Sequence, residues 1–229
     1  MNIFYAPPEQ IFGNIIELKG QEARHASKAL RYSEGDDIVV VDGKGSRYEG
    51  IVQIIEKDSL RVEIRKSKEI EKSAPRLILG LGIIKKRDRL EFAIEKAVEL
   101  GVAEIILFKS EHTVKQNVRM DRLESTAISA MKQSLQAWLP SIKVVSDLNH
   151  LLAQSDAKIL VAHEKIEDNN PSFEQYKVEK NLLLLIGPEG GFSEEEISQV
   201  LEAGGEKISL GKHRLRAETA VVTFLSQFI

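Results

Sequence analysis

Two strand-to-loop-to-helix junctions lie close together in the last fifth of the chain, and they constrain the fold more than any other feature. In the first, the apolar run LLLLI at 182–186 leads through a glycine loop to the helix start SEEE at 193–196. In the second, ISL at 208–210 leads through a basic turn to RAETA at 216–220. A continuous apolar run is typical of a strand buried on both faces of a parallel sheet. Because ligands bind beyond the carboxyl ends of such strands, we expect the two loops to meet around one ligand.

The first loop favours a ligand without phosphate. Its three glycines allow close backbone approach, and Ser193 and Glu196 have the spacing of a capping box. Glu189 lies within the loop, and three glutamates fill the first helical turn after it. These carboxylates would repel an anion, and the spacing matches neither a P-loop nor G-x-G-x-x-G. A neutral or cationic ligand fits better, and a tight turn without a ligand is the alternative.

The second loop leads into a helix whose apolar stripe is best explained by core packing. The stripe consists of Ala217, Ala220, Val221, Phe224, Leu225 and Phe228. Glu218 and Thr219 lie off it, in the first turn, where they either face a ligand or cap the helix. Arg216 either stabilises developing negative charge, contacts phosphate, or is a solvated surface arginine. Arg216 and Glu218 are therefore the candidate catalytic residues.

Taken together, these motifs resemble the bacterial 16S ribosomal RNA (uracil-N3) methyltransferases of the SPOUT superfamily, and the resemblance covers nearly the whole chain. The matching segments are GPEGGFS (187–193), LG (210–211), LRAETA (215–220), HASKALR (25–31), KAVELGV (96–102) and QS (133–134), with Pro140 after the last. The chain departs from the family pattern at Lys132, where a glutamate is common, and at Gln136, where a basic residue is common nearby.

The resemblance implies a fold, a cofactor and an assembly. The expected α/β fold has a C-terminal SPOUT domain at 76–229, with a trefoil-knotted parallel sheet, and an N-terminal small β-barrel of PUA-like or OB-like type at 1–70. The expected assembly is a homodimer with S-adenosylmethionine bound in the knot. That cofactor carries a sulfonium and an ammonium but no phosphate, in agreement with the charges of the first loop. The implied cofactor-binding residues are Leu185, Ile186, Gly187, Pro188, Glu189, Gly190, Gly191, Leu210, Gly211, Leu215, Thr219 and Ala220.

The implied reaction is methylation of N3 of uridine 1498, in the conventional numbering of 16S rRNA, within the 30S subunit. Uracil N3 carries a proton, so a base must remove it or a cation must stabilise the charge on the flanking oxygens. As a hypothesis, Arg216 supports that charge, and Glu218 positions the nucleophile or its proton. Two alternatives remain: another SPOUT enzyme that methylates a ribose 2′-hydroxyl or a tRNA base, and a non-catalytic RNA-binding or ribosome-assembly factor.

Composition indicates a cytoplasmic protein without metal or membrane association. The 229 residues contain no cysteine, no apolar run of transmembrane length and no signal-peptide layout at the amino terminus. His213 has no second histidine at ligand spacing, so a metal site is not expected. The net charge is −3, and residues 1–75 hold 12 Lys and Arg against 13 Asp and Glu. RNA binding must therefore depend on local patches.

Three basic clusters are candidates for RNA contact. The first combines Arg24, Lys28 and Arg31, on one face of a predicted helix, with His25, and an ordinary solvated helix face is the alternative. The second follows a predicted strand. The third lies in the second loop. The candidate residues are Arg24, His25, Lys28 and Arg31; Lys85, Lys86, Arg87 and Arg89; and Lys212 and Arg214.

The remaining pattern predicts two domains joined by a charged linker at Ser67 to Pro75. The segment before the linker favours strands at 37–42, 48–56 and 59–66 and a helix at 22–30. After it, strands and helices alternate, as in a mostly parallel α/β sheet. The predicted strands are 77–84, 104–108, 143–145 and 159–162, and the predicted helices are 88–100 and 121–138. Phe108 and Trp138 are expected in the core or at an interface, and the polar segment 164–180 is expected to be a mobile loop.

Overall fold

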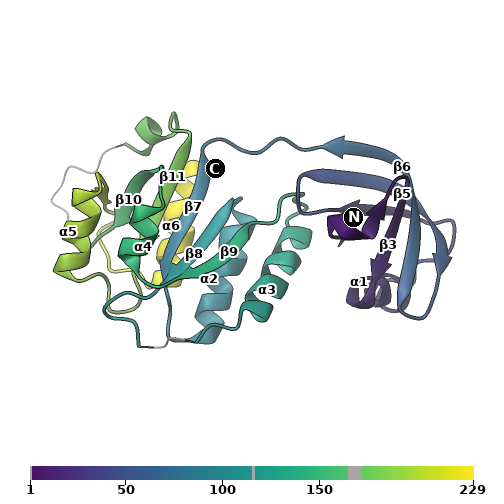
Figure 1. The fold of residues 1–229 in the computed structure, drawn as a ribbon, viewed down its shortest axis with the longest axis horizontal. Coiled ribbons are helices and arrows are strands. Elements are labelled where there is room, and N and C mark those ends of the chain that lie inside the picture. The colour runs from purple at the N-terminus through teal and green to yellow at the C-terminus, as the bar shows by residue number, and fades with distance from the viewer. Residues whose placement is uncertain (1, 115–116, 165–171) are drawn as a thin grey trace. The chain divides into compact units, whose positions relative to one another are not determined.

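The computed structural model of the chain describes residues 2–114, 117–164 and 172–229. The chain divides into two compact units. Unit 1 contains residues 1–72 with 128–139, and unit 2 contains residues 73–127 with 140–229. Over the described ranges, each unit is built on its own six-stranded sheet (Figure 1).

Unit 1 has a largely antiparallel sheet in the order β1-β4-β5-β6-β3-β2, in which only the described pair β1–β4 is parallel. Buried and less buried side chains alternate along its strands, so that Ile16 and Leu18, for example, face one core. The last three strands in chain order confirm the sequence prediction, whereas the short first three are not predicted. The strands are β1 (Ile3–Tyr5), β2 (Ile11–Phe12), β3 (Ile15–Lys19), β4 (Asp37–Val41), β5 (Ser46–Ile55) and β6 (Ser59–Glu69).

The helical segment of unit 1 differs from the single helix expected at 22–30. An α-helical turn, α1 (Gly20–Arg24), continues as a π-helical turn, η2 (His25–Ala29), and the 3₁₀ turn η1 (Pro8–Gln10) precedes β2. Arg31 lies beyond η2 with φ +58°, so its predicted place on one helical face with Arg24 and Lys28 is wrong. Glu22 accepts a hydrogen bond from the backbone N–H of Tyr5 at 3.0 Å.

Residues 128–139 pack within unit 1 through Trp138. The indole Nε1–H donates to the carbonyl oxygen of Ile70 at 2.8 Å. Its ring covers Gly45, where a Cβ would lie 2.3 Å from the nearest ring atom. Helix α3 (Met120–Gln133) ends five residues before the predicted position, because Leu135 adopts φ +58°. Strand β6 continues to Glu69, so the predicted linker begins too early.

Unit 2 has a sheet of six described strands in the order β12-β10-β11-β7-β8-β9, and every pair in it is parallel. This confirms the predicted parallel α/β architecture. β12 lies two residues earlier than the predicted 208–210, which leaves Leu210 in the following loop. The strands are β7 (Arg76–Gly82), β8 (Glu104–Phe108), β9 (Ser141–Val145), β10 (Lys158–Ala162), β11 (Asn181–Ile186) and β12 (Glu206–Ile208).

Helices cover both faces of this sheet (Figure 1). On one face α2 (Arg87–Glu99) packs against α6 (Ala217–Leu225), which also contacts β11. On the other, α4 (Leu148–Ala153) contacts α5 (Glu194–Glu202), β8 and β9. Leu183 and Leu185 of β11 point into the core beneath α4 and α5, and the alternate Leu182 and Leu184 are equally buried. Burial on both sides is why the sequence of β11 is continuously apolar.

The segment expected to be a mobile loop at 164–180 includes residues 165–171, which lie outside the described residues. Part of the described remainder forms the 3₁₀ turn η3 (Phe173–Tyr176), and mobility of the segment stays a prediction. The Phe173 ring lies 6.2 Å from that of Phe224 in α6 and 5.7 Å from that of Phe228 in the 3₁₀ turn η4 (Ser226–Phe228).

Candidate functional site

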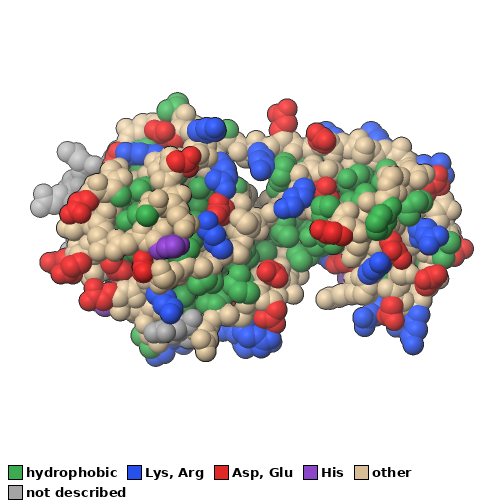
Figure 2. Space-filling view, in the orientation of Figure 1, with side chains coloured by type: hydrophobic (Ala, Val, Ile, Leu, Met, Phe, Trp, Pro, Cys, Tyr) green, Lys and Arg blue, Asp and Glu red, His purple; other side chains and the backbone are tan. Residues whose placement is uncertain are grey.

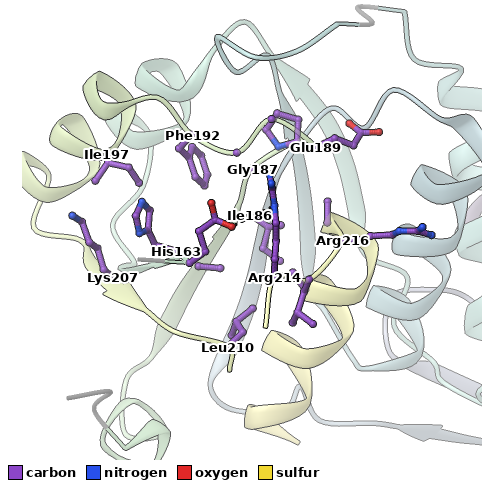
Figure 3. A pocket seen from close by; sticks show the side chains of 18 of the residues that line it. His163, Ile186, Gly187, Glu189, Phe192, Ile197, Lys207, Leu210, Arg214 and Arg216 are labelled. Carbon is purple, nitrogen blue, oxygen red and sulfur yellow. Dashed lines mark ion pairs between the residues drawn. The ribbon is translucent and has the colours of Figure 1, made fainter. Parts of the chain in front are cut away.

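A cavity of about 860 Å³ lies in unit 2 at the carboxyl ends of β10, β11 and β12. The glycine loop after β11 and the basic loop after β12 both line it, as the sequence predicts. Figure 3 shows His163, Lys207 and Ile197 on one side of the cavity and Glu189 and Arg216 on the opposite side. The sheet reverses its strand order between β7 and β11, so the cavity lies close to the position where open α/β sheets bind ligands.

The glycine loop packs against the end of β7 with no room for a side chain. A Cβ on Gly82 would lie 2.5 Å from Cδ and 2.7 Å from the backbone nitrogen of Pro188. Gly190 also has no room for a side chain, because a Cβ there would lie 2.7 Å from the Cβ of His112. Gly191 closes a turn by donating its N–H to the carbonyl of Pro188 at 2.9 Å, with φ +74°. Glycine is therefore required by space at Gly82 and Gly190 and by backbone conformation at Gly191.

Glu189 fixes the glycine loop to the segment between β7 and α2. The N–H of Lys85 lies 3.1 Å from Oε1 and 3.2 Å from Oε2 of this exposed carboxylate. Sequence reasoning leaves open whether Glu189 acts on the chemistry or holds the loops in shape. The contact gives it a structural role, while its charge remains beside the cavity.

Glu196 joins the start of α5 to the loop after β8. The capping box is confirmed: the N–H of Ser193 donates to Glu196 Oε2 at 2.9 Å, and the N–H of Glu196 donates to Ser193 Oγ at 3.2 Å. The same buried carboxylate accepts the Ser110 hydroxyl at 2.9 Å and the N–H of Glu111 at 3.1 Å. Glu196 thus supports the cavity loop from behind as well as capping its helix.

The basic loop reaches α6 through Arg216, which occupies the N-cap position and lines the cavity. Arg214 also lines the cavity and pairs with Glu164, with 3.3 Å between Nε and Oε2. Lys212 is exposed and does not line the cavity. Of the Lys and Arg residues in this loop, Arg214 and Arg216 therefore line the cavity and Lys212 does not.

Glu218, the second candidate catalytic residue, does not line the cavity. Its side chain is buried, and its Oε1 pairs with Nε of Arg89 at 3.4 Å. Its Oε2 is also buried and has no hydrogen-bond partner among the described residues. Arg89, assigned from the sequence to an RNA-contacting cluster, lines the cavity instead. Arg89 therefore borders the cavity, and Glu218 lies behind it.

A partly buried hydrogen-bond network supports the strand from which Lys207 reaches the cavity. The Tyr176 hydroxyl donates to Glu206 Oε2 at 2.5 Å, and Lys158 also pairs with Glu206. Burial, followed by the hydrogen bond to Glu206, raises the pKa of Tyr176 to about 12. The hydrogen bond from Lys158, followed by that from Tyr176, lowers the pKa of Glu206. Near neutral pH Glu206 is therefore a carboxylate and Tyr176 a neutral phenol.

Most of the predicted cofactor-binding residues lie together at the cavity. Two do not line it: Leu185 is buried in the core cluster, and Thr219 is exposed on α6. The residues that line it as predicted are Ile186, Gly187, Pro188, Glu189, Gly190, Gly191, Leu210, Gly211, Leu215 and Ala220.

The predicted RNA-contacting residues outside the cavity are divided between the two units. Arg24, His25, Lys28 and Arg31 are exposed in unit 1, and Lys85, Lys86 and Arg87 are exposed in unit 2. On the face shown in Figure 2, Lys and Arg side chains are interspersed with Asp and Glu.

Several residues at the site were not identified from the sequence. Gly82 lies inside the predicted strand 77–84, His163 follows β10 without a motif, and Lys207 precedes the predicted strand 208–210. A glycine inside a predicted parallel strand is the signal that points to Gly82. No group of three potential His, Cys, Asp or Glu metal ligands occurs in the part of the chain that the structure describes. None of its described helices is long and apolar enough to cross a membrane.

Comparison with known proteins agrees with this arrangement. Residues 71–229 match the family model of the RNA methyltransferase domain, and residues 18–65 match that of the RNA methyltransferase PUA domain. The ribosomal RNA small subunit methyltransferase E of Mesomycoplasma hyopneumoniae is 31% identical over 191 residues, which cover 78% of this chain and 80% of that protein. The enzyme of the same name from Rickettsia conorii is 29% identical over 93% of this chain and 88% of its own length.

Similarity to solved structures is equally extensive. The crystal structure of a ribosomal RNA small subunit methyltransferase E from Neisseria gonorrhoeae, bound to S-adenosyl methionine, superposes with a TM-score of 0.84 at 28% identity. The match covers 99% of this chain and 95% of that one. The family match covers more than half of the chain and includes every strand and helix that lines the cavity. The chain belongs to the RNA methyltransferase family that contains the ribosomal RNA small subunit methyltransferases E.

Proposed function

We propose that this protein binds S-adenosylmethionine in the cavity and methylates N3 of uridine 1498 in 16S rRNA of the small ribosomal subunit. The observation that carries the proposal is the meeting of two separate loops, 187–191 and 210–217, around one cavity in a chain of this family. The S-adenosyl methionine in the Neisseria gonorrhoeae structure supports the choice of cofactor.

The residues present at the cavity fit this cofactor. Ile186, Leu210 and Leu215 offer apolar surface to an adenine ring, and the glycine loop offers close backbone approach. The carboxylate of Glu189 lies at the cavity wall, where it favours a cationic ligand over a phosphate. When bound, the cofactor supplies a methyl group attached to a positively charged sulfur. The sulfur leaves as part of a neutral thioether, so the leaving group needs no acid to protonate it.

The protein's task is to bind and orient the cofactor and the target base and to exclude water, because the cofactor carries the reactive group. The target nitrogen must lose its proton, and the negative charge spreads onto the flanking oxygens of the uracil. Arg216, at the cavity and at the amino end of α6, is suited to stabilise that charge. Glu218 remains a candidate for positioning, but its place outside the cavity lining does not favour direct contact with substrate.

We further propose that the exposed basic residues of both units contact the RNA, and that the active form is a knotted homodimer. The PUA-domain match over residues 18–65 supports RNA binding by unit 1. Resemblance to the SPOUT enzymes supports the knot and the dimer. Sedimentation equilibrium tests the assembly: a mass of twice 25.7 kDa is expected, and a monomer that remains active contradicts the dimer.

The deciding experiment uses 30S subunits that lack the modification, the purified protein and cofactor labelled in its methyl group. Nucleosides from the treated RNA are separated and identified by mass spectrometry. The expected product is labelled 3-methyluridine in 16S rRNA. Labelled 2′-O-methyl nucleosides, or label only in tRNA, would identify a different SPOUT activity. A folded protein that binds no S-adenosylmethionine by calorimetry would contradict the enzymatic proposal itself.

A further inference from the structure

Arg89 and Glu218 form an ion pair between the first turns of α2 and α6. The Nε of Arg89 lies 3.4 Å from Oε1 of Glu218, and the side chains are 24% and 11% exposed. Arg89 lines the cavity and Glu218 does not. The arginine is therefore the member of the pair that can meet a ligand, and the glutamate lies behind it.

Burial of the Glu218 carboxylate lowers the stability of the fold, so helix capping alone does not explain why a glutamate occupies this position. Its Oε2 is buried and has no hydrogen-bond partner among the described residues. A buried carboxylate oxygen without a partner destabilises a protein, whereas an exposed carboxylate would serve the helix dipole equally well. A carboxylate retained in this position is well suited to holding a specific cation in a fixed orientation.

Arg89 differs from the arginine two residues earlier in α2. Arg87 is exposed, does not line the cavity, and lies 3.6 Å from Glu91, which also faces Arg122 at 3.5 Å. At the cavity, by contrast, Arg89 joins Arg216 among the lining residues. Two guanidinium groups from different elements thus border the same space, and Glu189 is the acidic residue of the glycine loop there.

We infer that Glu218 is a positioning residue that holds the Arg89 guanidinium at the cavity, where Arg89 stabilises the negative charge of the deprotonated uracil. This inference rests on the proposed methylation of uracil N3. In that step the N3–H bond breaks and its proton passes to solvent. The N3 electron pair then forms the bond to the methyl carbon while the carbon–sulfur bond breaks. The two electrons of the carbon–sulfur bond remain on the departing sulfur. Charge on the uracil oxygens exists only between proton loss and methyl transfer, so a fixed cation favours that stage.

The test is the pH dependence of single-turnover methylation of 30S subunits. Removing the guanidinium in Arg89→Met should lower the rate at least tenfold at pH 7, and the deficit should shrink as pH rises because hydroxide assists deprotonation. The nearly isosteric Glu218→Gln should shift the profile in the same direction but less, and Glu218→Asp should restore part of the loss. If Glu218 acts through Arg89, the double variant should be no slower than Arg89→Met alone.

Matched measurements separate this role from stability and from cofactor binding. Arg76→Met removes an arginine paired with Glu104 at 2.5 Å, at the opposite end of β7, and should leave the rate and its pH profile unchanged. Calorimetry should show S-adenosylmethionine affinity within twofold of the original in Arg89→Met and Glu218→Gln, and circular dichroism should show that both are folded.

Distinct outcomes overturn the inference. A pH profile of Arg89→Met parallel to that of the original protein, or a change only in the concentration of protein that gives half-maximal single-turnover rate, would assign Arg89 to RNA binding instead. Additive losses in the double variant would show that Glu218 acts independently of Arg89. Failure of the unaltered protein to methylate N3 of uridine would contradict the proposed function, and that result is distinguishable from both.

Discussion

The carboxylate of Glu189 accepts the backbone N–H of Lys85, with 3.1 Å to Oε1 and 3.2 Å to Oε2. The two residues are 104 positions apart, and the contact links the loops that follow β11 and β7. Glu189, which is a candidate for the chemistry of the site, therefore also positions the backbone of the loop that follows β7.

Replacing Glu189 with alanine should weaken cofactor binding through loss of this contact. A net hydrogen bond contributes about 0.5–1.5 kcal/mol, and exposure places this one near the lower end, so we expect a roughly two- to fivefold rise in Kd. Glu189→Gln keeps an acceptor oxygen and should retain most of the affinity if geometry dominates. Calorimetry with S-adenosylmethionine measures both. Equal losses in the two variants would instead assign the effect to the carboxylate charge.

Substitution of Gly82 should disturb the cavity although the residue does not line it. A Cβ there would lie 2.5 Å from Cδ and 2.7 Å from N of Pro188, so Gly82→Ala must displace the glycine loop. Overpacking of this kind costs about 1–3 kcal/mol, and we expect cofactor affinity to fall at least tenfold. Gly82→Ala with unchanged affinity and stability would show that the loop can move without consequence.

Gly191 should be sensitive for a different reason. No atom lies within 4 Å of a Cβ built at Gly191, so the cost of Gly191→Ala comes from its φ of +74° and amounts to about 1–2 kcal/mol. Gly101→Ala is the matched control, because Gly101 has φ +78°, equal space and a position outside the cavity lining. Both variants should lose similar stability in urea unfolding, but only Gly191→Ala, and more strongly Gly191→Val, should lose cofactor affinity.

The Ser110–Glu196 hydrogen bond should be worth more than a surface contact, because both residues are buried. We expect Ser110→Ala to lower the free energy of unfolding by about 1.5–3 kcal/mol, the range for hydrogen bonds to charged groups. Chemical denaturation measures the change. Ser27→Ala, which removes a hydroxyl bonded only to a helical carbonyl in unit 1, is the control and should have a smaller effect. Equal effects would contradict a special role for the Glu196 network.

Acid should destabilise unit 2 partly through Glu206. The hydrogen bonds from Lys158 and then Tyr176 lower the pKa of Glu206 in the folded state below its usual 4.5. A carboxyl group whose folded-state pKa is lowered adds stability above its unfolded pKa, and that stability is lost as pH falls towards the folded value. Unfolding measured from pH 7 to pH 3 should therefore be less pH-dependent in Glu206→Gln. An identical slope in the two proteins below pH 4.5 would contradict this assignment.

The sequence was sufficient for the parallel sheet, for both cavity loops and for the capping box at Ser193, because each has a local signature: a continuous apolar run, glycines, or a serine three residues before a glutamate. The misplaced β12 and the early end of α3 show the limits of such signatures. Lys207 was missed with β12, and Leu135 takes a left-handed conformation that nothing in its residue type predicts. The roles of Arg89 and Glu218 depend on which side chain reaches the cavity, and this is decided by how α2 packs against α6.

The contacts that shape the cavity have a consequence for the order of folding. Glu189 bonds to a residue 104 positions away, and Glu196 to one 86 positions away. Such nonlocal contacts form slowly, because a long loop must close before any of them is gained. During refolding, helical signal should therefore appear before the protein can bind S-adenosylmethionine, and the cavity should be among the last features of unit 2 to mature.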